Sequence, residues 1–240
     1  YIFEYNYKDR LIVRMGYMFN YNSAGERMAN NTIKSNSFSI RAGLESAGNV
    51  MYAISNLTKQ SKNSDGEYSL LSIPYAQYVK GDFDFSRNIV IDDKNAIAYH
   101  VGVGIAVPYG NSKSIPYIKQ YFSGGANSVR GWSVRELGPG SFPGDGNYLN
   151  QSGDIKFDAS IEYRSKLFWL LQGALFVDAG NIWTIKEYEN QPGGQFDISK
   201  FYKQIAFAYG LGIRIDLDYL VFRIDGGMKA LNPAYSSGKQ

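Results

Sequence analysis

Residues 205–217 read IAFAYGLGIRIDL and alternate between large apolar side chains and small or polar ones. The large apolar set is Ile205, Phe207, Tyr209, Leu211, Ile213, Ile215 and Leu217. Between them lie Ala206, Ala208, Gly210, Gly212, Arg214 and Asp216. Because successive side chains of a strand point to opposite faces, this period predicts a β-strand with one apolar and one polar face.

The same alternation recurs along the chain, and helical periodicity is nearly absent. The segments predicted as strands are 1–7, 10–21, 37–47, 74–91, 96–108, 154–166, 172–184, 203–217 and 219–230. Short links at 92–95, at 167–171 and around Asp218 alternate with long ones at 48–73, 109–153 and 185–202. Tight turns therefore lie at one end of the predicted sheet and long loops at the other, although 22–36 is long on the short-turn side.

Two architectures use strands with one apolar face. A soluble sandwich buries its apolar faces together, whereas a transmembrane barrel turns them to lipid and keeps a polar lumen. Most of the predicted strands are longer than the five to six residues, roughly, that are usual in soluble proteins, and reach the ~9–11 needed to cross a bilayer. Charges of both signs on the polar faces, and the short turns opposite long loops, also favour an all-β, antiparallel transmembrane β-barrel.

Composition excludes several classes of function. The chain of 240 residues has no cysteine and one histidine, so we expect no catalytic nucleophile of the cysteine type, no metal site and no cofactor. The net charge of +3 is spread along the sequence, so no nucleic-acid partner is expected. No apolar run reaches the length of about 18 residues that a transmembrane helix needs.

Nine strands conflict with the even strand number of bacterial single-chain barrels. Two unpaired edges would also face lipid, which does not satisfy backbone hydrogen bonds. We therefore expect residues 1–240 to be a fragment of a transmembrane β-barrel that lacks strands at both ends.

The long connection at 109–153 contains SGGANSVRGW, residues 123–132. Its apolar residues argue against disorder, so we expect it to fold into the lumen. Arg130 would then meet carboxylates on the wall, for which Glu162 and Asp178 are the candidates, because a guanidinium forms strong paired bonds with carboxylates. Gly124, Gly125 and Gly131 would permit the backbone turns.

Residues 115–140, IPYIKQYFSGGANSVRGWSVRELGPG, resemble the signature of the BamA/TamA-like outer-membrane assembly superfamily, with wording closer to the TamA-like branch. The loop tetrad of that family is matched by Val129, Arg130, Gly131 and Trp132, and its two acidic wall residues by Glu162 and Asp178. The resemblance covers about 115–230. It implies that residues 1–240 are the C-terminal part of an outer-membrane β-barrel domain, roughly strands seven to fifteen of sixteen, with the periplasmic POTRA domains, the early strands and the last strand absent.

The resemblance implies an insertase of the outer membrane of a Gram-negative bacterium, and not an enzyme. Its partners would be unfolded outer-membrane proteins, outer-membrane lipid, and periplasmic or lipoprotein accessory subunits, with substrate strands pairing at a lateral seam. A two-partner polypeptide secretion channel carries the same motif and remains an alternative. A passive porin, or a soluble β scaffold, is a third interpretation.

Overall fold

The computed structural model describes residues 9–23, 36–217 and 220–235. The predicted strand at 1–7, most of the 22–36 connection and the turn at Asp218 lie outside these residues. The strands of the main sheet are β1 (Arg14–Asn22), β2 (Ser37–Ala47), β5 (Tyr78–Val90), β6 (Asn95–Pro108), β7 (Ile155–Phe168), β8 (Leu171–Trp183), β9 (Ala206–Asp216) and β10 (Val221–Leu231). They form one sheet in the order β1-β2-β5-β6-β7-β8-β9-β10, with every neighbour antiparallel.

The sheet has an apolar outer face and a polar inner face, as the alternation predicts. On β9 the apolar residues from Phe207 to Ile215 are exposed, while Ala206, Ala208, Arg214 and Asp216 are buried. The register carries this division across the sheet, because Tyr209 lies opposite Val177 and Asp178 opposite Ala208. An exposed apolar face on strands of 9 to 14 residues fits a bilayer better than water.

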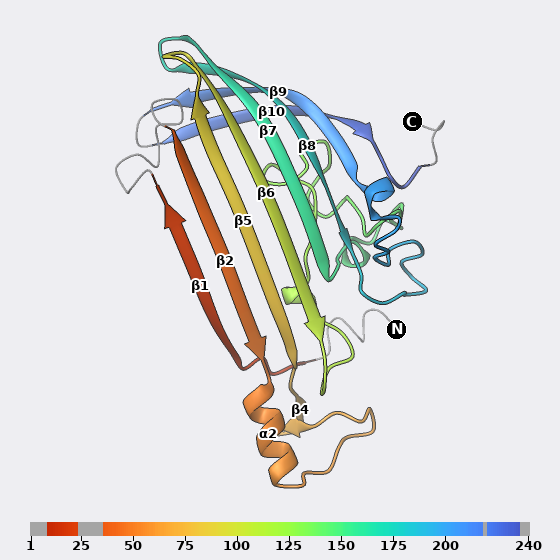
Figure 1. Cartoon of the computed structure of the whole chain (residues 1–240). Coiled ribbons are helices and arrows are strands. Elements are labelled where there is room, and N and C mark those ends of the chain that lie inside the picture. Colours follow the sequence, from red (N-terminus) through yellow and green to blue (C-terminus); the bar gives the residue numbers. More distant parts are fainter. Residues whose placement is uncertain (1–8, 24–35, 218–219, 236–240) are drawn as a thin grey trace.

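The long connections gather at one end of the sheet (Figure 1). The turns that join β5 to β6 and β7 to β8 lie at the opposite end. The sheet curls so that β9 and β10 pass behind β5 to β8, and the loop at 109–153, drawn in green, lies on the inner side of the curl. In the described residues the sheet is open, with β1 and β10 at its two edges.

The connection at 48–73, which the sequence predicted only as a long link, has secondary structure of its own. It contains a helix, α2 (Asn49–Leu57), and a small hairpin of β3 (Ser69–Leu70) and β4 (Ile73–Pro74). The strand predicted at 74–91 therefore starts later, at Tyr78. Likewise, a short 3₁₀ turn, η4 (Phe201–Gln204), precedes β9, so the strand predicted from 203 begins at Ala206. None of the described helices is long and apolar enough to cross a membrane.

The loop at 109–153 provides several of the large buried apolar side chains, among them Ile115, Tyr121 and Trp132. It includes two further 3₁₀ turns, η2 (Tyr117–Lys119) and η3 (Tyr148–Asn150). One buried cluster joins Ile115 and Tyr121 of the loop to Tyr78 and Ile182 of the wall. A second joins three loop residues to small residues of β9: Val129, Trp132, Leu137, Ala206 and Ala208. The loop is therefore packed on the sheet as part of the core.

Candidate functional site

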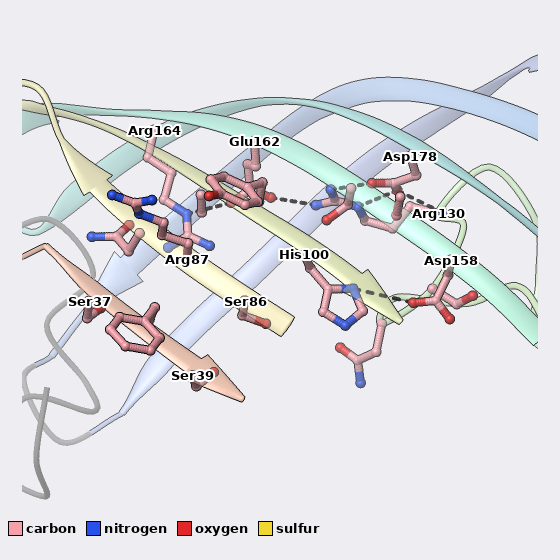
Figure 2. Close-up of a pocket in the computed structure, with 18 of the residues that line it drawn as sticks. Ser37, Ser39, Ser86, Arg87, His100, Arg130, Asp158, Glu162, Arg164 and Asp178 are labelled. Atoms are coloured by element: carbon pink, nitrogen blue, oxygen red, sulfur yellow. Dashed lines mark hydrogen bonds and ion pairs between the residues drawn. The ribbon is translucent and has the colours of Figure 1, made fainter. Parts of the chain in front are cut away.

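The Arg130 side chain is inserted between the loop and the wall, and 7% of it is exposed. It binds Asp178 through two parallel bonds, from Nε to Oδ2 at 2.7 Å and from Nη2 to Oδ1 at 2.8 Å. Nη1 donates to Oε2 of Glu162 at 2.7 Å, and Figure 2 shows the arginine between these two carboxylates. The guanidinium carbon also lies 3.4 Å from the centre of the Phe176 ring. These contacts use the planar fork, the charge and the flat face of arginine together.

The two carboxylates depend on Arg130 to different degrees. Asp178 is fully buried, and every hydrogen bond to its carboxylate within the described residues comes from Arg130, including one from the backbone N–H at 3.1 Å. Glu162 is also bound by Arg164 at 2.6 Å and by Arg214 at 2.7 Å. Loss of Arg130 would thus isolate Asp178 but would leave Glu162 with two cations.

The cluster extends further than the sequence predicted, to β9 and β10. Nη1 of Arg130 lies 3.5 Å from Oδ2 of Asp225 on β10, and Arg223 lies 3.0 Å from the same oxygen. Arg214 comes from β9. In the sequence, Asp225, Arg223 and Arg214 could be recognised only as charged residues on the polar face of a strand, a feature that several other residues share. Only the register of the strands selects the ones that meet.

The loop glycines have two different roles. Gly124 and Gly125 have φ values of 94° and 89°, so they make the backbone turns that the sequence predicted. Gly131 lies in a turn closed by the Trp132 N–H and the Val129 carbonyl oxygen at 3.2 Å, but its backbone is not in the left-handed region. Glycine is needed there for close packing, because a Cβ atom would lie 2.9 Å from Cβ of Ala208 and 3.3 Å from the backbone of Lys229.

The remaining tetrad residues pack the loop onto the wall. Val129 is fully buried and Trp132 is 4% exposed, and both contact the small side chains of β9. On β10, Gly227 lies opposite Gly210 in the register. A Cβ atom on Gly227 would come within 2.5 Å of the Arg130 carbonyl oxygen, so this glycine makes room for the loop backbone.

A polar cavity of about 370 Å³ adjoins the arginine cluster, and His100 lines it (Figure 2). The Nε2 atom of His100 lies 3.0 Å from Asp84, and Nδ1 lies 3.3 Å from Asp158. The two carboxylates are at opposite sides of the ring and do not converge on one point. In the described part of the chain, no group of three or more histidine, cysteine, aspartate or glutamate side chains could hold a metal ion.

Ionisable groups also hold the loop near its middle, at Glu136, and where it leads into β7, at Asp154. Glu136 pairs with Lys229 of β10 at 2.8 Å. Burial alone would raise the pKa of the Glu136 carboxyl, but Lys229 and the Ser133 N–H lower it below its usual range. At the C-terminal end of the loop, burial raises the pKa of the Asp154 carboxyl, although the Ile185 N–H donates to it at 3.1 Å.

A curled antiparallel sheet with a lipid-type outer face, and an inner loop held by a buried arginine, defines the wall of an outer-membrane β-barrel. The chain belongs to the Omp85 superfamily, whose domain matches residues 2–238. This result confirms the superfamily that the motif indicated. Assignment to the TamA-like branch stays a prediction.

Several relatives carry names that state a role in assembly. The chain is 35% identical over 97 residues to the outer membrane protein assembly factor BamA of Neisseria meningitidis serogroup B, covering 37% of this chain and 12% of that protein. It is 26% identical over 159 residues to the human sorting and assembly machinery component 50 homolog, covering 60% of this chain and 32% of the relative.

A solved structure supports the fold. The crystal structure of BamA from Haemophilus ducreyi lacking POTRA domains 1-3 matches 91% of this chain and 51% of its own, with a TM-score of 0.50 and 17% identity. The chain thus spans about half of that structure and a third or less of the two relatives above.

Proposed function

We propose that the protein containing this chain helps to insert or translocate outer-membrane proteins, or lipid, through a lateral seam of its barrel. The work would be done by main-chain pairing and by local disturbance of the bilayer, without covalent catalysis. The name of the bacterial relative, an outer membrane protein assembly factor, supports this class of substrate, and the name of the human relative also states a role in assembly. An unpaired strand edge can accept an incoming strand by hydrogen bonding.

The observation that carries the proposal is the reach of Arg130 across the wall. It is bonded to β7 and β8, and it lies 3.5 Å from the Asp225 carboxylate of β10. The loop backbone is also seated against Gly227. The position of the loop is therefore coupled to the outermost described strand at one edge of the sheet. A seam whose opening depends on loop position would follow from this coupling.

The proposal includes a setting for the whole protein. We place it in the outer membrane of a Gram-negative bacterium, with periplasmic POTRA domains and accessory subunits acting on unfolded barrel substrates. The Omp85 domain and the bacterial relative support this setting.

The test is depletion of the full-length protein followed by quantification of every other outer-membrane barrel. Re-expression of wild type should restore the barrels, whereas Arg130→Ala should restore them poorly. Arg164→Ala is the matched control, because it removes an arginine from the same cluster and leaves Glu162 paired with two others.

Other outcomes point to the other functions. Loss of one secreted protein, with the barrels unchanged, would replace the proposal with a two-partner secretion channel. If neither changes, and a steady conductance is unaffected by Arg130→Glu, the protein is a passive pore.

A further inference from the structure

The helix α2 has its apolar side exposed and its polar side fixed to the protein. Val50, Ile54 and Leu57 are 62%, 52% and 83% exposed, and Ala53 is exposed with them. Their spacing of i, i+3, i+4 and i+7 places all four on one side of the helix, and we call this set the apolar stripe. A helix packed only on its own protein would show the reverse arrangement.

Hydrogen bonds on the other side fix the direction in which the apolar stripe points. The Tyr75 hydroxyl donates to Ser55 at 3.1 Å, and the Tyr68 hydroxyl donates to Asn56 at 3.0 Å. Asn49 accepts from Tyr109 at 2.7 Å and also from Gln77. These partners belong to the segment around the β3–β4 hairpin and to the start of the next loop. The helix therefore cannot bury its apolar stripe by turning without losing several bonds.

The apolar stripe begins where the lipid-facing surface of the sheet ends. Only Gly48 separates β2 from α2, and its φ of 77° turns the chain directly from strand to helix. The outer-face residue of β2 nearest to this turn with a large side chain is Leu44, which is 60% exposed. Figure 1 shows α2 leaving the end of β2 on the long-loop side of the sheet. The two apolar surfaces are thus consecutive along the chain.

Charge is absent over this region and returns immediately after it. Residues 46–58 contain no charged side chain. Glu45, on the inner face, is paired with Lys119 at 2.8 Å. Beyond the helix, Lys59 and Lys62 are both exposed. Lysines that directly follow an apolar stripe can meet anionic headgroups at a membrane surface.

The adjoining hairpin adds exposed apolar residues at its turn. Leu71 and Ser72 have φ values of 50° and 66°, a conformation that favours asparagine and glycine. Leu71 is nonetheless 88% exposed. Neither contact with water nor the backbone conformation of this turn favours a leucine at position 71. An apolar environment around the side chain would explain why a leucine is found there.

From these observations we infer that α2 is an interfacial anchor, whose apolar stripe is inserted into the outer-leaflet boundary of the membrane. The occupant is lipid and not a polypeptide, because the apolar stripe offers no hydrogen-bonding side chain and continues a lipid-facing surface. The anchor would hold the β2–β5 connection against the membrane. This inference does not depend on the proposed assembly function.

The chain has no cysteine, which permits clean single-site labelling. In the full-length protein, with any other cysteines replaced, Ile54→Cys is spin-labelled in outer-membrane vesicles. Collision rates are then measured with oxygen, which concentrates in lipid, and with a water-soluble nickel complex. Ile161→Cys, on the outer face of β7, gives the lipid reference, and Ser64→Cys, on the exposed part of the connection, gives the water reference.

We expect the label at position 54 to collide more often with oxygen than with the nickel complex, as the label at position 161 should. The label at position 64 should show the opposite preference. A label that is as open to nickel as at position 64 would overturn the inference, because the apolar stripe would then lie in water. A label shielded from both reagents would also overturn it and would indicate a protein partner. All three substituted side chains are exposed or lie on the outer face, so folding should be retained.

Discussion

Replacing Arg130 with alanine removes the hydrogen-bonding partner of a carboxylate that has no access to solvent. Asp178 is 0% exposed, and its bonds from the described residues come from Arg130. Removing one partner of a buried ion pair costs about 3–5 kcal/mol, because the remaining charge is left unpaired. Each ~1.4 kcal/mol is a factor of ten, so release of the loop should become between about a hundredfold and a few thousandfold more frequent.

Proteolysis of the loop measures this population directly. The segment at 138–147, GPGSFPGDGN, lies in the same loop and is rich in glycine and proline. When the loop closes faster than it is cut, the cleavage rate follows the fraction that is open. The full-length Arg130→Ala variant should be cut faster than wild type by about the factor given above. Arg164→Ala should stay within about tenfold of wild type, because it isolates no carboxylate.

The partner residues provide a sharper version of this test. In the Arg130→Ala background, Asp178→Asn should recover much of the protease resistance, because it removes the unpaired charge and keeps the shape. Glu162→Gln in the same background should not, because Glu162 still has Arg164 and Arg214. The reasoning is refuted if Arg130→Ala is cut no faster than Arg164→Ala, or if the two second substitutions rescue equally. The coupling is read as a double-mutant cycle.

Two further predictions concern the wall and its charge. Gly227→Ala should shift the loop backbone and lower the free energy of unfolding in urea by about 1–3 kcal/mol. Gly226→Ala should have little effect, because the nearest atom to its Cβ is 3.9 Å away. Equal losses would contradict the close contact between Gly227 and the loop backbone. Burial raises the pKa of Asp154 in the folded state, so folding favours the protonated carboxyl. The stability that this group contributes is complete below the ordinary carboxyl pKa of about 3.9, and it is lost as the pH rises through the pKa of the folded state. Asp154→Asn, which keeps an oxygen that can accept from the Ile185 N–H, should therefore unfold at a higher urea concentration than wild type at pH 7. This difference should disappear in acid. A difference that grows in acid would show that the pKa of Asp154 is not raised.

The strands could be predicted because their burial is one-sided. In residues 205–217 every second side chain is apolar, so a shift of one residue would turn the whole set to the wrong face. The same alternation gave β2 its observed bounds, 37–47. Boundaries failed where a strand is preceded by another structure. The prediction at 74–91 began in the β3–β4 hairpin, whose residues also read as extended.

The helix α2 could not be found from period alone. It has nine residues, only Gly48 separates it from β2, and Val50 and Ile54 are among the β-branched residues that favour strands. Its apolar positions do have helical spacing. These positions are exposed, however, whereas apolar residues at helical spacing normally predict a face that packs on the core.

The loop site was predictable as far as its motif reaches. Arg130 and its two carboxylates follow from the resemblance and from their inward positions. The unequal dependence of Asp178 and Glu162 does not, because it arises from Arg164 and Arg214, which come from two different strands. Asp225 was recognisable only as one inner-face charge among many. Such pairings are set by register and strand curvature, which no local pattern encodes.

The paired glycines of the wall have a mechanical consequence. Where Gly210 lies opposite Gly227, the inner side of the β9–β10 pair has no side chain of its own; the backbone of Arg130 lies against Gly227, and the Phe176 ring lies against Gly210. A sheet resists bending partly through contacts between its side chains, so this part of the wall takes its stiffness from the loop. We expect the wall to be rigid while the loop is seated and easy to flex once it leaves. The rigidity of this barrel edge is then an adjustable quantity, and a single arginine sets it.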